Sequence, residues 1–285
     1  MPTVDVDGVS LFYQEKGAGE PVLFCHGIPT DYRAWLSQMD VFSDRYKAIS
    51  YSRRYAAPNK REGDVMDSTV GNNAGDLKGL IARLGVGPVH LVGHSYGGFI
   101  AAFLAVDHPD LVRSLVLVEP AVSTLLVENP NSKTEMLSLL LRNPSIALSA
   151  RRFLNGSLNP SFEALARGDD ERAVELNVDG VQDRHGAFAT MPDDVKKMMI
   201  ENARTIEELK TKFPTFKDHV KRIQCKTLVI NGEEGAPWLR RIGELFATLA
   251  PHGETVKVSH AKHFPHIENA SEFNQEVLGF LSRKQ

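Results

Sequence analysis

Ser95 is the side chain whose surroundings point most directly to nucleophilic chemistry. It lies at the centre of GHSYG, residues 93–97, which fits the pattern G-x-S-x-G. Residues 89–92 read VHLV and predict a short buried strand, whereas 98–106 are small and apolar and predict a helix. A serine on a tight turn between a strand and a helix forms a nucleophile elbow, whose flanking glycines provide the space that the strained turn needs. The helix N-terminus would then favour negative charge that develops at the site.

Alternating strands and helices would have to position this serine. Before the elbow, strand patterns occur at 3–6, 9–15, 21–25 and 46–51, and helical patterns at 31–43 and 70–84. After it, a buried strand follows at 114–119. Continuous apolar runs such as PVLFC at 21–25 suit a sheet that is covered on both faces. The alternation predicts an α/β protein with a mostly parallel, doubly wound sheet.

The alternation stops after the sixth strand. From about residue 121 to 221 we find only short helical patterns, broken by prolines and glycines, over a stretch too long for a loop. Strand patterns resume at 225–231 and 255–258, with helices at 237–249 and 270–281. We therefore expect a core domain of residues 1–121 and 222–285, with a helical cap of residues 122–221 inserted between strands 6 and 7.

Composition restricts the class of protein. The 285 residues carry a formal net charge of -3, with 24% charged and 42% hydrophobic residues, which is ordinary for a globular protein. We find no basic stripe for nucleic acid and no apolar run long enough for a membrane span, so neither partner is expected. The N-terminus lacks the pattern of a signal peptide, and Cys25 and Cys225 read as buried thiols. These features predict a cytoplasmic protein.

Over nearly its whole length the chain resembles the α/β-hydrolase superfamily. The resemblance rests on HGIP at 26–29 after a strand, GHSYGG at 93–98, the helical insert after the sixth strand, and HFPHIEN at 263–269. It implies the α/β-hydrolase fold and an activity like that of capped serine esterases, lactonases, carbon–carbon hydrolases or cofactor-free haloperoxidases.

The same resemblance assigns the partners of Ser95. The fold runs nucleophile, acid, histidine along the chain, so the base should be a late histidine. His263 matches the family position, and His260 is its main rival. Two backbone N–H groups should form the oxyanion hole, one from Ile28 and the other from Tyr96.

The acid departs from the family pattern. Relatives usually carry Asp in a Gly-x-x-Asp turn after the penultimate strand, but here the turn reads GEEG and ends at Gly235. One alternative is Glu119, at the carboxyl end of the strand beside the nucleophile strand, where some members of the superfamily place the acid. The other is Glu234 or Glu233, one or two residues before the usual position. A chain without any acid is the third possibility.

These residues predict a serine hydrolase that cleaves a small carboxylic ester or lactone through an acyl-enzyme on Ser95. Two other functions remain open. One is carbon–carbon bond hydrolysis or perhydrolysis on the same fold, and the other is that of a slow or non-catalytic ligand receptor. An epoxide hydrolase is disfavoured because such enzymes carry Asp at the position of Ser95. No metal-ligand spacing and no G-x-G-x-x-G after a strand occur, so we expect neither a metal nor another cofactor. The sequence leaves the oligomeric state open.

Overall fold

The described residues form one eight-stranded sheet with helices on both faces. The computed structural model describes residues 2–60, 65–129 and 132–283, so the predicted domain ends at residues 1 and 285 lie outside these ranges. The strand order is β1-β2-β4-β3-β5-β6-β7-β8. The strands are β1 Thr3–Val6, β2 Val9–Lys16, β3 Pro21–Cys25, β4 Lys47–Tyr51, β5 Val89–His94, β6 Val112–Val118, β7 Lys226–Gly232 and β8 Gly253–Val258.

The sheet is mostly parallel, as its sequence pattern predicts. From β4 through β3, β5, β6 and β7 to β8, every neighbouring pair is parallel, whereas the β1–β2 and β2–β4 pairs are antiparallel. All six residues of β5 are buried, because helices cover both sides of this central strand. The carboxyl ends of β5 and β6 therefore meet at one edge of the sheet, where ligand sites gather in such folds.

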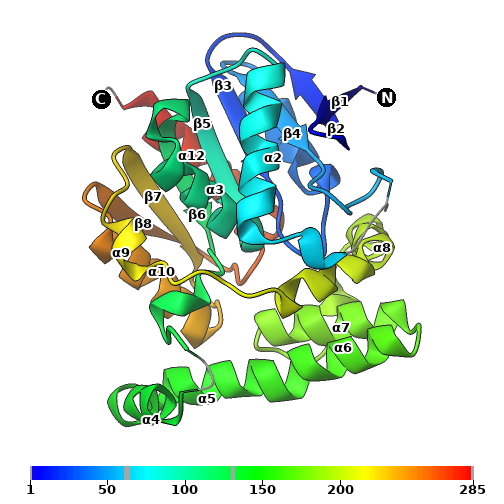
Figure 1. The fold of residues 1–285 in the computed structure, drawn as a ribbon, viewed down its shortest axis with the longest axis vertical. Helices are drawn as coiled ribbons and strands as arrows, with labels where there is room; N and C mark the ends of the chain where they lie inside the picture. The colour runs from blue at the N-terminus through cyan, green and yellow to red at the C-terminus, as the bar shows by residue number, and fades with distance from the viewer. Residues whose placement is uncertain (1, 61–64, 130–131, 284–285) are drawn as a thin grey trace.

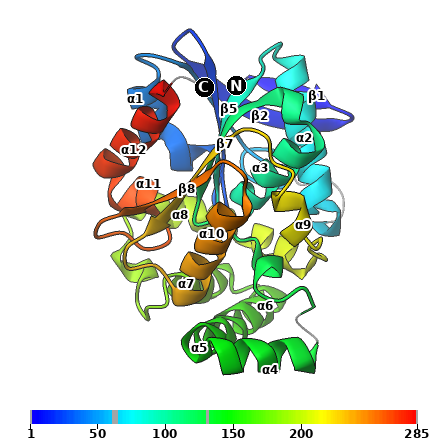
Figure 2. The ribbon, with the colours of Figure 1, turned by 90° about the vertical axis from the view of Figure 1, so that its left-hand side faces the viewer.

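Two groups of helices cover the sheet. One face packs α1 (Leu36–Phe42) and α12 (Ala270–Ser282), and the other packs α2 (Val70–Arg83), α3 (Tyr96–Asp107) and α10 (Pro237–Leu249). Viewed along the sheet, α1 and α12 lie on the opposite side from α2 and α3 (Figure 2). Each face has its own apolar cluster, so the sheet is held between two hydrophobic layers.

Residues 122–221, which we call the insert, lie between β6 and β7. Their helices are α4 Lys133–Arg142, α5 Pro144–Phe153, a π-helical turn Leu154–Leu158, α6 Asn159–Ala166, α7 Asp170–Val181, α8 Asp193–Glu201, a 3-10 helix Ala203–Lys210 (η7) and α9 Lys217–Val220. The described part of the insert contains no strand. Helices α4 to α7 lie beyond one end of the sheet (Figure 1). That the insert is a separate cap domain with these bounds stays a prediction.

The two cysteines are free. Cys25 is buried at the end of β3, beside the hydroxyl of Tyr51, whereas Cys225 is partly exposed just before β7. Burial raises the pKa of both thiols to about 11. Both therefore remain protonated at neutral pH and lack the thiolate that nucleophilic chemistry would need.

Candidate active site

Ser95 occupies a strained turn directly after β5 and directly before α3. Its backbone has φ 52° and ψ -117°, a conformation that non-glycine residues rarely adopt. Two hydrogen bonds to the neighbouring segment hold it there: Ser95 N–H donates to the Val118 carbonyl at 2.9 Å, and Ala121 N–H donates to the Ser95 carbonyl at 3.1 Å. The end of β6 thus fixes the elbow that β5 enters.

Gly97 lets the elbow approach the loop that follows β3. A Cβ at this position would collide with the backbone carbonyls of Cys25 and His26. The close packing brings Ile28 and Tyr96 into the wall of the same cavity as Ser95. Tyr96 is the first residue of α3, so its N–H has no acceptor within the helix and is available to a ligand.

His263 is the histidine that reaches Ser95. It lies between β8 and α11 (Pro265–Glu268), and its Nε2 is 3.1 Å from Ser95 Oγ. Two contacts hold its backbone: its carbonyl accepts from His94 Nε2 at 2.8 Å, and its N–H donates to Gln182 Oε1 at 3.2 Å. Burial lowers the pKa of His263 to about 4, so the ring is neutral at pH 7 and Nε2 can accept a proton.

Glu119 stands on the other side of the His263 ring. Its Oε2 is 3.5 Å from His263 Nδ1, and its Oε1 accepts a hydrogen bond from Gly232 N–H at 2.8 Å. The 3.5 Å separation is longer than a good hydrogen bond, and catalytic hydrogen bonds commonly tighten when a substrate binds. Like Ser95, Glu119 has a positive φ, 47°, immediately after its strand.

Burial also sets the proton affinity of Glu119. Its side chain is fully buried, which raises its pKa to about 8. The hydrogen bond from Gly232 N–H opposes this rise, whereas the nearby charge of Glu268 adds to it. An ionised Glu119 would orient His263 Nδ1–H and stabilise an imidazolium, so any such role requires that Glu119 loses its proton.

The other predicted acids lie outside this cluster. Glu233 is exposed, and Glu234 has a half-exposed carboxylate that pairs with Lys262 Nζ at 2.8 Å. The rival histidine, His260, is exposed and lies 4.0 Å from Glu234. Position 235 is different: a Cβ on Gly235 would lie 2.9 Å from Glu119 Oε1. The Glu119 carboxylate therefore occupies space that a side chain at position 235 would need.

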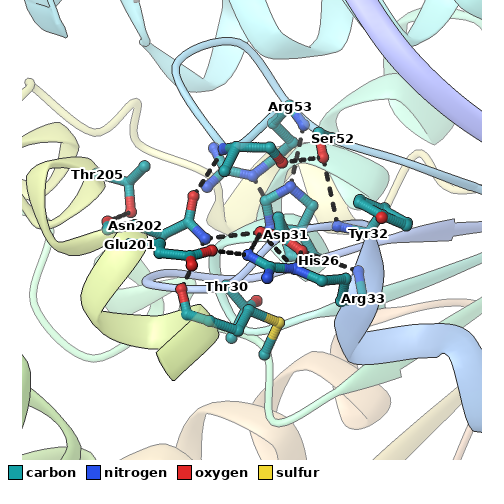
Figure 3. Close-up of polar contacts among 12 residues, drawn as sticks. His26, Thr30, Asp31, Tyr32, Arg33, Ser52, Arg53, Glu201, Asn202 and Thr205 are labelled. Atoms are coloured by element: carbon teal, nitrogen blue, oxygen red, sulfur yellow. Dashed lines mark hydrogen bonds and ion pairs between the residues drawn. The ribbon is translucent and has the colours of Figure 1, made fainter. Parts of the chain in front are cut away.

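A buried arginine supports the loop that carries Ile28. Arg53 is fully buried, and its Nε donates to the His26 carbonyl at 3.1 Å (Figure 3). Its Nη1 pairs with Glu208 of η7 at 2.6 Å, and its guanidinium lies 5.0 Å from the centre of the Tyr96 ring. Because Glu208 belongs to the insert, this ion pair joins the insert to both halves of the predicted oxyanion hole.

A cavity of about 780 Å³ contains Ser95 and His263 in its wall. Its volume is typical of a site for a small molecule. Most of its lining is apolar and comes from the insert, including Met136, Leu139, Phe153 and Val181. Trp238 of α10 also lies in the wall.

The described residues contain neither a metal-binding cluster nor a membrane-spanning helix. Among them, no group of three or more histidine, cysteine or acidic side chains is arranged to hold a metal ion. Within the same ranges, none of the helices is both long and apolar enough to cross a bilayer.

The site contains contacts that the sequence reasoning did not identify. No sequence motif indicates the contacts of Gln182 and Glu208, or the overlap between a side chain at position 235 and Glu119. Glu268 was noticed only as part of HFPHIEN, and in the structure its Oε2 accepts hydrogen bonds from the N–H groups of Lys262 and Phe264 at 2.7 and 3.1 Å. The spacing of that motif is the one sequence signal for this contact, because it places the Glu268 carboxylate four to six residues after the N–H groups that it binds.

Comparisons with known proteins identify the family of the fold. A family model described as the alpha/beta hydrolase fold matches residues 20–270. An epoxide hydrolase 2 of Siraitia grosvenorii is 32% identical over 69% of this chain, but the match spans only 54% of that relative. The non-heme chloroperoxidase CPO-A1 of Kitasatospora aureofaciens is 26% identical over 97% of this chain and 98% of its own length.

One solved structure matches over the whole length with a similar identity. Est816, described as an N-acyl homoserine lactone degrading enzyme, superposes with a TM-score of 0.65 at 26% identity, covering 98% of this chain and 100% of that one. These proteins carry different activities on one fold, so the chemistry of this chain has to be argued from its own site.

Proposed function

Because the chain belongs to the α/β-hydrolase fold family, we propose that it is a serine hydrolase that cleaves a small carboxylic ester or lactone through an acyl-enzyme on Ser95. One observation carries the proposal: Ser95 Oγ, on a strained elbow in a cavity wall, is 3.1 Å from the neutral ring of His263. A hydroxyl paired with a neutral buried imidazole is the arrangement that activates a serine.

The proposed reaction follows from the positions of these groups. Ser95 Oγ attacks the carbonyl carbon while His263 Nε2 takes the hydroxyl proton, and the carbonyl oxygen becomes an oxyanion. The backbone N–H groups of Ile28 and Tyr96 stabilise that oxyanion. His263 then gives its proton to the leaving oxygen, which releases the alcohol, or opens the ring of a lactone, and leaves the acyl-enzyme.

Water completes the cycle. His263 removes a proton from a water molecule that attacks the acyl carbonyl, and the proton returns to Ser95 Oγ as the acid product leaves. Glu119 takes part through His263: its carboxylate accepts Nδ1–H and stabilises the imidazolium present in both steps. Of the acids predicted from sequence, we propose Glu119, because its Oε2 lies 3.5 Å from Nδ1, while Glu234 pairs with Lys262 and Glu233 is exposed.

The cavity supports an apolar acyl group. Phe153 of α5 stacks on Trp238 at a ring-centre distance of 4.9 Å, and both line the cavity. Each methylene moved from water into such a wall contributes about 0.8 kcal/mol, or about fourfold in kcat/KM, until the space is filled. The insert thus acts as a cap that selects the acyl chain, and Phe153→Ala should move the preferred chain length upward.

The test is hydrolysis of p-nitrophenyl esters of increasing chain length and of matched N-acyl and alkyl lactones. We expect activity in the wild type and none above background in Ser95→Ala, and a fluorophosphonate probe should label the wild type alone. If Ser95→Ala retains the activity, or if the wild type neither hydrolyses nor labels, the proposal is wrong.

Two other activities use the same groups. The full-length match to a non-heme chloroperoxidase supports one of them, perhydrolysis, in which peroxide replaces water in the second step. Adding peroxide together with a carboxylic acid to the assay and measuring peracid distinguishes it. Carbon–carbon hydrolysis would instead appear as cleavage of a diketone with no ester turnover.

A further inference from the structure

The loop that carries His263 is held by side chains at three consecutive backbone N–H groups. Those of Lys262 and Phe264 donate to Glu268 Oε2 at 2.7 and 3.1 Å, and the one between them, of His263, donates to Gln182 Oε1 at 3.2 Å. Gln182 Nε2 in turn donates to Glu268 Oε1 at 2.9 Å. The side chains of Gln182 and Glu268 thus accept from all three N–H groups and are hydrogen-bonded to each other.

These two side chains come from different parts of the molecule. Glu268 is the last residue of α11 and belongs to the same segment as His263. Gln182 directly follows α7, lies in the insert, and is 2% exposed. The backbone position of His263 therefore depends on a residue of the insert, which binds the His263 N–H.

The end of α7 lines the cavity and is hydrogen-bonded to a second helix that lines it. Asn177 and Val181 of α7 line the cavity. The next residue after Gln182, Asp183, accepts hydrogen bonds from Arg152 Nη2 at 2.9 Å and Ser149 Oγ at 3.1 Å, both on α5. Helix α5 contributes Ala150 and Phe153 to the same wall. A continuous set of contacts therefore runs from the walls that a substrate would touch to the N–H of His263.

We propose that Gln182 is a positioning residue through which the docked insert holds His263 in line with Ser95. The inference rests on the proposed function, because it assigns His263 as the base. It concerns the geometry of proton transfer, not the shape of the cavity. A substrate that packs against α5 and α7 stabilises the contacts that end at Gln182, and the site becomes fully ordered only with the insert in place.

The central variant is Gln182→Met, which keeps the volume of the side chain but replaces the amide by a thioether that accepts only weakly from His263 N–H and cannot donate to Glu268. We expect kcat to fall about 10- to 100-fold with KM changed less than twofold, because binding walls stay intact while the base is misplaced. Gln182→Asn, which keeps the amide but shortens it by one methylene, should give the same kcat effect in a second folded variant.

A matched control breaks a different contact between insert and core. Glu201 ends α8 and pairs with Arg33 at 2.6 Å, beside the loop of Asp31 (Figure 3). Glu201→Gln removes this ion pair and leaves the His263 loop untouched, so its kcat should stay within twofold of the wild type. An equal loss of kcat in Glu201→Gln would mean that general weakening of the insert, and not Gln182, misplaces the base.

Hydrogen exchange tests the same contact without any turnover. In the wild type the amides of 262–264 should exchange slowly, and Gln182→Met or Gln182→Asn should accelerate that peptide while peptides of β5 and β6 stay unchanged. Unchanged exchange at 262–264, or a fall in kcat/KM that comes only from KM, would overturn the inference. Because this readout needs no substrate, it separates a wrong role for Gln182 from a wrong assignment of the reaction.

Discussion

Moving the catalytic acid between two positions gives the sharpest test of the site. Glu119 Oε1 lies 2.9 Å from the place that a Cβ on Gly235 would occupy, so the two positions share one space. Gly235 has no positive φ, so a side chain there strains no backbone angle, and its next tight contacts would be the Gly232 carbonyl at 3.1 Å and Arg240 Cγ at 3.3 Å. Removing the glutamate side chain and adding Asp at 235 should therefore return a carboxylate to the same side of the His263 ring.

Glu119→Ala alone should lower kcat by about 10³- to 10⁴-fold, because His263 loses the group that orients Nδ1–H and stabilises the imidazolium. Gly235→Asp alone should also be harmful, because it forces a Cβ and a second carboxylate against Glu119, at a cost of about 1 to 3 kcal/mol in overpacking before any charge repulsion. In the double variant the carboxylate is restored and the overpacking against Glu119 is relieved. We therefore expect its kcat to be at least about 100-fold higher than that of Glu119→Ala.

The assay is steady-state hydrolysis of the best ester found for the wild type, with thermal unfolding to show that each variant is folded. The matched control is Glu119→Ala combined with Gly235→Asn, which has the same shape and no charge and should not recover. Glu234→Gln should retain activity within about twofold, because its partner is Lys262. If Glu119→Gln keeps activity within tenfold of the wild type, or Asp and Asn at 235 perform alike, the assignment of Glu119 is refuted.

Three other predictions follow from the buried charges. Catalysis needs ionised Glu119 and neutral His263, so kcat/KM should rise with pH through about 8, the pKa of Glu119. A wild-type pH profile of kcat/KM that rises only near pH 4 would contradict this. Because the pKa of Glu119 is raised from 4.5 in the unfolded chain to about 8 in the folded protein, folding favours its neutral form, and the folded protein loses stability progressively as pH rises from about 4.5 to about 8. Urea unfolding should therefore show Glu119→Gln to be more stable than the wild type at pH 9, by up to about 5 kcal/mol, and equal to it at pH 4. Glu208→Leu leaves the guanidinium of Arg53 buried without its partner, so it should cost about 3 to 5 kcal/mol of unfolding free energy, whereas a change below 1 kcal/mol would show that this ion pair is not needed.

Local patterns were sufficient for much of the fold. Each of the eight strands was predicted within about three residues of its observed ends, because the strands are short apolar runs bounded by turn residues. The elbow was equally clear, since strand, serine turn and helix follow one another within 89–107. The parallel arrangement followed from the alternation of strands with helices, which allows few other topologies.

The acid shows where local patterns end. Sequence alone left Glu119 and the pair Glu233 and Glu234 open, because each lies near the carboxyl end of a suitable strand. Their separation depends on side-chain direction: Glu119 turns inward and accepts from Gly232 N–H, 113 positions away, whereas Glu234 points to Lys262. Nothing within a few residues of either glutamate encodes that difference.

The sequence by itself therefore determined the elements and the chemical groups: the Ser95 elbow, the loop at His263 and the alternation that builds the sheet. These features depend on contacts between neighbours in the chain and on the periodicity of apolar residues. Only the tertiary structure decided which groups meet, because β5, β6 and β7 lie side by side and the insert folds back over their ends. The link from Gln182 to His263 spans 81 positions, so it exists only once the insert has docked.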